Sequence, residues 1–257
     1  FHMWTPDVYE GAPTAITAFF AIAPKLAATA LIFRFCLGPF GDFYFEWTQV
    51  IFFLSVSSMF LGAIAAIAQK SLKRLLAYSS IGHIGYVLIA LVAANDQGIK
   101  SASIYMFIYL IMNISVFSIL LSIKKSDVYV DEINDLNGLS KSNPVVSALL
   151  AIIMLSMAGI PPFIGFFGKF YIFIAAIEGQ LYLLAILGVL ASVISAFYYL
   201  RVIKGMYFDE ESQAGDSIDF IISSHSKIIL LVSMFIIIFF ILYPSFLTDI
   251  VSGISLS

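Results

Sequence analysis

The sequence predicts an all-α polytopic membrane protein with about seven transmembrane helices, one of them broken at Pro161-Pro162. Of its 257 residues, 61% are hydrophobic and 11% are charged. Several apolar stretches reach the roughly 18 to 20 residues that span a bilayer. The formal net charge of −3 gives no sign of nucleic-acid binding. We therefore expect an integral membrane protein that has lipids around it and no nucleic-acid partner.

Polar and apolar stretches alternate along the chain and define its elements. Residues 1–12 are too polar and too rich in turn formers for a span, whereas Pro13 suits the first turn of a helix. The expected spans are 13–37, 49–68, 75–94, 102–123, the broken element 145–160 with 163–177, then 181–208 and 227–248. The loops between them include 38–48, the long polar stretch 124–143 and the acidic stretch 209–220.

The fifth of these spans contains the sequence Gly159-Ile160-Pro161-Pro162 between two apolar runs. Proline lacks the N–H of the helical ladder and restricts the residue before it, so the helix must break here. In hydrocarbon, the freed backbone groups persist only where protein or an internal water cavity satisfies them. The break therefore indicates a path for something polar, and Lys169 follows it by seven residues.

The distribution of basic residues predicts how the spans are oriented. If the broken element crosses the membrane once, the loops at 69–74, 124–143 and 201–227 share one face. That face holds nine of the thirteen basic residues: Lys70, Lys73, Arg74, Lys124, Lys125, Lys141, Arg201, Lys204 and Lys227. The opposite face keeps Arg34 and Lys100. The positive-inside rule thus favours seven spans, with the basic face toward the cytoplasm or the matrix.

Three side chains that can carry a positive charge lie well inside the expected spans. Lys25 and Lys169 have no charged neighbour in sequence, and a lysine at a helix centre costs about 2.5 to 3.5 kcal/mol. Each must face protein or water, and a desolvated lysine can serve as a proton carrier; snorkelling or a structural pairing is the alternative. His83 is a weaker relay candidate, since a lone buried histidine usually makes packing or hydrogen-bond contacts.

Other residues point to structure rather than chemistry. Asn113, Tyr109, Ser156 and Tyr198 are expected to form interhelical hydrogen bonds, and the basic cluster at 69–74 to fix topology. The single cysteine, Cys36, builds neither a disulfide framework nor a cysteine-rich metal site. The sequence has no GxGxxG, Walker, HExxH or CxxC motif. We therefore predict no catalytic residue, metal or bound cofactor in this chain.

Four stretches carry a family resemblance: FHMWTPDVYEGAPTAITAFFAIAPK at 1–25, QKSLKRLLAYSSIGHIGY at 69–86, MLSMAGIPPFIGFFGKFYIF at 154–173 and FYYLRVIK at 197–204. Together they resemble subunit N of bacterial respiratory complex I, called subunit 2 in mitochondria, over essentially the whole chain. The stretch WTPDVYEGAP is fairly specific for this subunit, whereas KRLLAYSS and GIPP occur in the other antiporter-like subunits. That family is similar to the membrane subunits of Mrp-type sodium/proton antiporters.

The resemblance implies a fourteen-helix fold of two inverted five-helix repeats, of which this chain matches helices eight to fourteen. Lys25 then stands at the central lysine of helix eight and Lys169 at the lysine of broken helix twelve, both implied proton-relay residues. The implied parts are a polar first segment at 1–12, a helix with its loop at 13–48, the repeat at 49–208 and a loop with a last helix at 209–257.

The resemblance further implies a proton-translocating membrane subunit of NADH:ubiquinone oxidoreductase, with the other membrane-arm subunits as partners. FMN, iron–sulfur clusters and ubiquinone would belong to the complex and not to this chain. A glutamate and a lysine of the family's first half have no counterpart here, so we expect either a separate N-terminal half or a fragment. A split subunit would favour the mitochondrial inner membrane over a bacterial plasma membrane. An Mrp-type cation/proton antiporter and a structural subunit that no longer pumps are the alternatives.

Overall fold

The computed structural model describes residues 3–125, 128–210 and 218–251. The long helices are α2 (Thr14–Leu37), α3 (Tyr44–Ile67), α4 (Leu72–Ala93), α5 (Asp96–Leu120), α7 (Pro144–Ala158), α8 (Ile164–Glu178), α9 (Tyr182–Phe208) and α10 (Ser224–Phe239). The short ones are α1 (Thr5–Gly11), α6 (Leu139–Ser142) and α11 (Ser245–Val251). Single 3-10 turns cover Gly41–Phe43, Ile133–Leu136 and Phe240–Leu242. The strands are β1 (Ile123–Lys125), β2 (Val128–Tyr129) and β3 (Ile218–Phe220).

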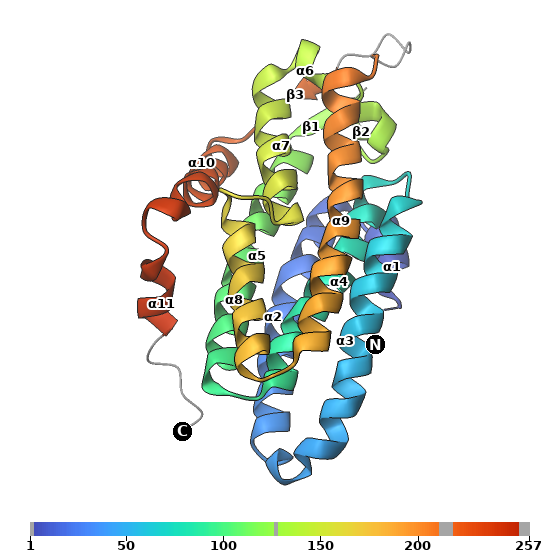
Figure 1. The fold of residues 1–257 in the computed structure, drawn as a ribbon. Coiled ribbons are helices and arrows are strands. Elements are labelled where there is room, and N and C mark those ends of the chain that lie inside the picture. The colour runs from blue at the N-terminus through green and yellow to red at the C-terminus, as the bar shows by residue number, and fades with distance from the viewer. Residues whose placement is uncertain (1–2, 126–127, 211–217, 252–257) are drawn as a thin grey trace.

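The helices run back and forth along one bundle axis. Figure 1 shows α7 and α8 end to end, the second continuing the direction of the first, and α9 returning beside them. Within the described residues, six helices are long and apolar enough to cross a membrane. The end-to-end pair α7 and α8 adds a seventh, broken crossing. The predicted all-α fold with about seven crossings is therefore confirmed.

Several helices begin before the apolar stretches that predicted them, because polar side chains cap their first turns. Ser71 precedes α4 and accepts a hydrogen bond from the Arg74 backbone N–H at 3.2 Å. Asn95 likewise accepts from the Gly98 N–H at 2.6 Å at the start of α5. Such caps satisfy orphan donors at the helix N-terminus. The helical spans thus extend beyond the apolar core of the predicted segments.

The last predicted span, 227–248, is wrong as a single helix. The α-helical part of α10 ends at Phe239, one 3-10 turn follows, and α11 begins anew at Ser245. Pro244 explains the interruption because it lacks an N–H and disfavours helical geometry at the residue before it.

The sequence predicted loops at 124–143 and 209–220, but the structure has short strands in both. The central strand β1 pairs antiparallel with β2 on one side and with β3 on the other, with Lys124 opposite both Tyr129 and Asp219. Residues 126–127 and 211–217 of these loops lie outside the described part of the chain. The small sheet joins the connection after α5 to the one before α10.

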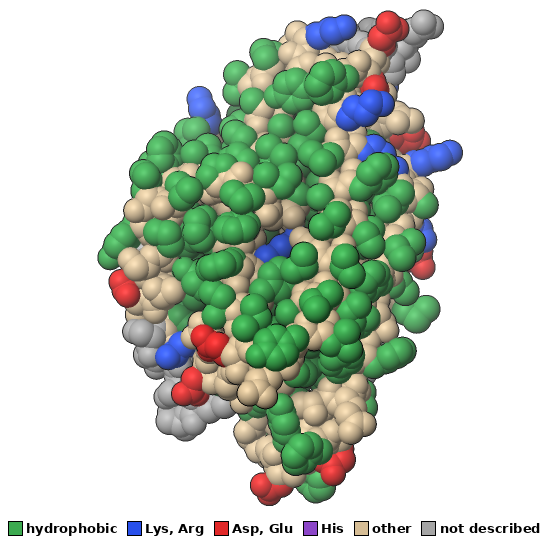
Figure 2. Space-filling model, viewed as in Figure 1, with side chains coloured by type: hydrophobic (Ala, Val, Ile, Leu, Met, Phe, Trp, Pro, Cys, Tyr) green, Lys and Arg blue, Asp and Glu red, His purple; other side chains and the backbone are tan. Residues whose placement is uncertain are grey.

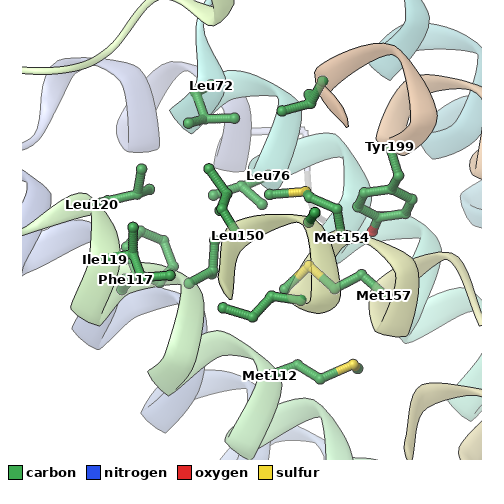
Figure 3. Packing of buried hydrophobic residues seen from close by; sticks show 14 of the residues in the cluster. Leu72, Leu76, Met112, Phe117, Ile119, Leu120, Leu150, Met154, Met157 and Tyr199 are labelled. Carbon is green, nitrogen blue, oxygen red and sulfur yellow. The ribbon is translucent and has the colours of Figure 1, made fainter. Parts of the chain in front are cut away.

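The hydrophobic core lies around α4, which is buried along nearly its whole length. A helix that is apolar on all sides is expected in such a central position. Figure 3 shows the side chains that meet there, from α4 (Leu72, Leu76), α5 (Met112, Phe117, Ile119, Leu120), α7 (Leu150, Met154, Met157) and α9 (Tyr199). The core therefore holds both halves of the chain together at the level of the broken helix.

The surface is divided as a membrane protein requires. On the face drawn in Figure 2, apolar side chains cover the middle, and the charged side chains gather mostly toward the two ends. The connections after α3, α5 and α9 lie at the same end, uppermost in Figure 1, and carry the predicted basic cluster. We call this end the basic end.

At the basic end, Arg201 ties α9 to α3. Its guanidinium donates hydrogen bonds to the carbonyl oxygens of Ile67 and Gln69, where α3 ends. Bonds from a charged donor are worth about 1.5 to 3 kcal/mol each.

We expect Arg201→Met to lower the thermal unfolding midpoint of the detergent-solubilised protein clearly, because both of these hydrogen bonds are lost. Lys204→Met is the control: Lys204 lies on the same helix and forms only an exposed ion pair with Asp209, so this variant should hardly change the midpoint. Equal midpoints for the two variants would contradict the role of Arg201 in holding α9 to α3.

Candidate functional site

The helix break forms one wall of the candidate site. The chain leaves α7 through Gly159, whose φ of +83° suits glycine. Across the break, the Gly165 N–H donates to the Ser156 hydroxyl at 3.1 Å. The end of α7 leaves carbonyl groups without helical partners, and the partial negative charge of a helix C-terminus attracts a cation. The break therefore creates an acceptor site inside the bundle.

Lys169 occupies that acceptor site. Its ammonium donates to the carbonyl oxygen of Ala158, the last residue of α7, and to the hydroxyl of Ser192 on α9, both at 2.8 Å. The same nitrogen lies 5.1 Å from the ring centre of Tyr86, a cation–π contact. Only 5% of the residue is exposed, so this lysine does not snorkel. It is held by one broken-helix carbonyl, one hydroxyl and one aromatic face.

Lys25 lies in a second buried site, within α2. Its ammonium donates to the hydroxyl of Tyr9 at 2.7 Å and to that of Tyr109 at 3.4 Å. It also lies over both rings, 4.9 Å and 5.9 Å from their centres. The residue is 6% exposed, and no carboxylate within the described residues forms an ion pair with it. A structural ion pair, the alternative for this lysine, is therefore not what holds it.

His83 of α4 lies in a group of tyrosines between the lysine sites. Its Nδ1 is 2.7 Å from the Tyr105 hydroxyl and its Nε2 is 3.2 Å from the Tyr199 hydroxyl. Tyr199 in turn shares a hydrogen bond with Ser79. The imidazole is thus bonded at both nitrogens, and either nitrogen can carry the proton, depending on the tautomer.

Aromatic contacts connect His83 to each lysine site. Its ring centre lies 5.4 Å from that of Tyr109, which contacts Lys25, and 6.4 Å from that of Tyr86, which lies under Lys169. The Tyr86 hydroxyl is buried and has no hydrogen-bond partner among the described residues. A buried hydroxyl of this kind is a position where water commonly binds. Ring contacts therefore link Lys25 to Lys169 across four helices, while the hydrogen bonds of His83 go to Tyr105 and Tyr199.

A cavity of about 380 Å³ opens between α2, α3 and α4 and reaches Lys25. Its remaining lining is mostly apolar and includes Phe20, Ile32 and Leu54. Lys25 thus has Tyr9 and Tyr109 as polar partners on one side and lines the cavity on the other.

Comparison with known proteins shows the family to which this chain belongs. The family model described as NADH:quinone oxidoreductase/Mrp antiporter, TM, matches residues 1–195, which include both lysines and His83. The chain belongs to this family. Family membership confirms the relationship that the sequence resemblance indicated.

Bacterial members of the NADH:quinone oxidoreductase/Mrp antiporter family have similar sequences. NADH-quinone oxidoreductase subunit N of Rhodospirillum rubrum is 50% identical over 249 residues, 97% of this chain and 50% of the relative. The subunit of the same name from Pelagibacter ubique is 51% identical over 256 residues, 100% of this chain and 54% of the relative. The chain thus spans about half the length of the relatives it matches.

Solved structures agree with the family assignment. A chain of respiratory complex I from Thermus thermophilus matches with a TM-score of 0.81 and 29% identity, over 97% of this chain and 54% of that one. A chain of the Mrp complex from a Dietzia species matches with a TM-score of 0.80, over 96% of this chain and 54% of that one. Its 19% identity shows a shared fold alone.

Within this family fold, the structure places all three predicted relay candidates in the buried interior. Of the predicted hydrogen-bonding residues, Tyr109 contacts Lys25, and Ser156 bridges the helix break. Sequence reasoning missed Tyr9, Tyr86, Tyr105 and Tyr199, which contact the candidates directly. Two signals could have found some of them: Tyr86 lies three residues after His83 and Tyr105 four before Tyr109, each on one helix face.

Among the described residues, no group of three or more His, Cys, Asp or Glu side chains could hold a metal ion. The side chains that hydrogen-bond to Lys25, His83 and Lys169 carry tyrosine and serine hydroxyls, which can both donate and accept a proton.

Proposed function

We propose that this chain is part of a proton-translocating membrane subunit of a respiratory NADH:quinone oxidoreductase. The observation that carries the proposal is the buried line of Lys25, Tyr109, His83, Tyr86 and Lys169. The identity of about 50% to subunit N of bacterial enzymes over nearly the whole chain supports it. The chain itself would carry no redox centre; FMN, iron–sulfur clusters and ubiquinone would be bound elsewhere in the complex.

In this proposal, Lys169 and Lys25 take up and release protons, and His83 passes charge between them. The hydroxyls that accept from the two ammonium groups can also donate, so each lysine keeps a partner after it loses its proton. Quinone chemistry elsewhere would shift the line between two arrangements. Each charge moved against a potential of 100 mV costs about 2.3 kcal/mol, a cost that the redox reaction would have to supply.

The partners in this proposal are other membrane-arm subunits and lipids. Residues 49–208 would form the second inverted repeat, flanked by 13–48 and 209–257. The basic end would face the cytoplasm or the matrix. The bacterial relatives support a plasma membrane, while the mitochondrial inner membrane stays the prediction from the sequence.

The main alternative is a cation/proton antiporter of the Mrp type, which would use the same lysines without an electron-transfer partner. The shared fold of the Mrp complex is compatible with it, but the identity to that complex is 19%, against about 50% to subunit N. A purely structural subunit is a weaker alternative, because a scaffold gains nothing from two buried lysines without carboxylate partners.

Replacing Lys25 by methionine tests the proposal. Methionine fills similar space but carries no proton, so we expect NADH-driven proton uptake by membrane vesicles to fall roughly a hundred-fold, as about 3 kcal/mol of added barrier would produce. Proton uptake and NADH oxidation are measured in the same vesicles, with amounts of assembled complex compared on native gels. Lys141→Met, at an exposed position, is the matched control. Normal uptake in Lys25→Met would sink the proposal.

A further inference from the structure

The seven-residue helix α1 lies against the start of α4 and is held there by two basic residues. Lys73 donates from its ammonium to the backbone carbonyls of Glu10 and Ala12, at 3.1 Å and 3.3 Å. Arg74 forms ion pairs with the carboxylates of Asp7, at 3.0 Å, and of Glu10. These contacts engage both the side chains and the C-terminal carbonyls of α1. The pair Lys73 and Arg74 therefore acts as a clamp on α1.

The buried face of α1 carries Tyr9, which no solvent reaches. Its hydroxyl is the nearer of the two oxygens that accept from the Lys25 ammonium, at 2.7 Å against 3.4 Å for Tyr109. Its backbone carbonyl accepts from the Thr17 hydroxyl at 3.1 Å, which links α1 to the first turns of α2. Tyr9 thus connects the clamp at the basic end with the buried lysine.

The clamp matters because α1 cannot maintain its position alone. A helix of seven residues is unstable without tertiary contacts, and its N-cap residue Trp4 makes no capping hydrogen bond. The buried side chains of Thr5, Pro6 and Tyr9 pack α1 against the bundle, and the contacts of Lys73 and Arg74 hold it from its exposed side. A topological role, which the sequence indicated for these basic residues, does not require specific bonds to α1.

We propose that Tyr9 is a positioning residue for Lys25, and that Lys73 and Arg74 keep it in place by clamping α1. This inference rests on the proposed function, because it concerns how Lys25 is presented to the buried line. The Tyr9 hydroxyl and ring fix the ammonium within reach of Tyr109. Without the hydroxyl, the ammonium keeps only the longer hydrogen bond to Tyr109 and is held less firmly in one position.

Tyr9→Phe tests this inference because it removes the hydroxyl and keeps the ring. The protein is studied in the membranes of a host in which the variant replaces the native chain. We expect fewer protons taken up per NADH oxidised than in the wild type, with a normal amount of assembled complex. Tyr44→Phe is the matched control, since Tyr44 donates to the Val92 carbonyl at 3.1 Å, away from both lysines. Its proton-to-NADH ratio should equal that of the wild type.

The double variant Tyr9→Phe with Lys25→Met separates positioning from scaffolding. If Tyr9 acts through Lys25, the double variant pumps as poorly as Lys25→Met and no worse. Additive losses, or a wild-type ratio in Tyr9→Phe, would overturn the inference. Arg74→Gln, which loosens the clamp without altering Tyr9, should lower the ratio in the same Lys25-dependent way. If Tyr9→Phe does not assemble, Arg74→Gln therefore tests the positioning role of Tyr9 in its place.

The same set distinguishes this inference from the proposed function. If Lys25→Met itself pumps normally, the proposed function fails. If Lys25→Met is defective and both Tyr9→Phe and Arg74→Gln keep the wild-type ratio, the proposed function stands and only the positioning role is lost.

Discussion

Replacing Lys169 by methionine is expected to abolish nearly all NADH-driven proton uptake while the complex still assembles. The ammonium is the group that occupies the acceptor site at the end of α7, through the Ala158 carbonyl and the Ser192 hydroxyl. Without a group that can be protonated there, a proton would have to cross this part of the membrane as an unpaired charge. A barrier increase of about 3 kcal/mol corresponds to roughly a hundred-fold slower transfer.

Two further variants make this result specific to proton exchange. Lys169→Arg retains a positive charge but does not release its proton, so it should pump as poorly as the methionine variant. Lys100→Met, at the end of the bundle opposite the basic end, is the control and should pump normally. All three are compared by proton uptake per NADH in sealed vesicles. Normal pumping in Lys169→Arg would show that Lys169 supplies only a fixed charge, and would contradict its role as a carrier.

Replacing Gly165 by alanine is expected to prevent correct folding of the broken helix. A Cβ at this position would overlap the carbonyl oxygen of Ser156 and crowd its hydroxyl. These atoms belong to the backbone and to the bond that closes the break, so they cannot move aside without separating α7 from α8. Overpacking of this kind costs about 3 kcal/mol, and the displaced α7 would withdraw the acceptor site from Lys169.

The amount of assembled protein on a native gel and its thermal unfolding in detergent measure the effect of Gly165→Ala. Gly41→Ala is the matched control, because no atom lies within 4 Å of a Cβ added there. We expect normal assembly for Gly41→Ala and a strong loss for Gly165→Ala. Equal assembly of the two variants would mean that α7 and α8 are not packed as closely as described.

The fold was largely predictable because most membrane spans can be recognised in the sequence as long, continuous apolar stretches. The break was predictable for a different reason: two prolines remove backbone donors whatever the tertiary context. Helix ends were less predictable, since Ser71 and Asn95 extend helices into polar sequence. The interruption near Pro244 follows from the same proline rule, and it was missed because the apolar run that contains it is long enough to span a membrane.

The lysines of the site stand out in sequence, but their partners do not. A lysine inside an apolar run is conspicuous, whereas a tyrosine in a membrane helix is equally compatible with lipid, core or interface. The contact from Tyr9 to Lys25 joins a segment outside the spans to the middle of one, and nothing in the local pattern predicts it. The pairing of β1 with β3 is equally non-local, because it joins loops about ninety-five residues apart in sequence.

The central claim is that this chain works within a respiratory NADH:quinone oxidoreductase. Its most direct test is a native gel of mildly solubilised membranes, stained for NADH dehydrogenase activity, with the peptides of the active band identified by mass spectrometry. We expect to find this chain in the active band. If the chain migrates apart from all NADH dehydrogenase activity, the claim is contradicted and the antiporter alternative takes its place.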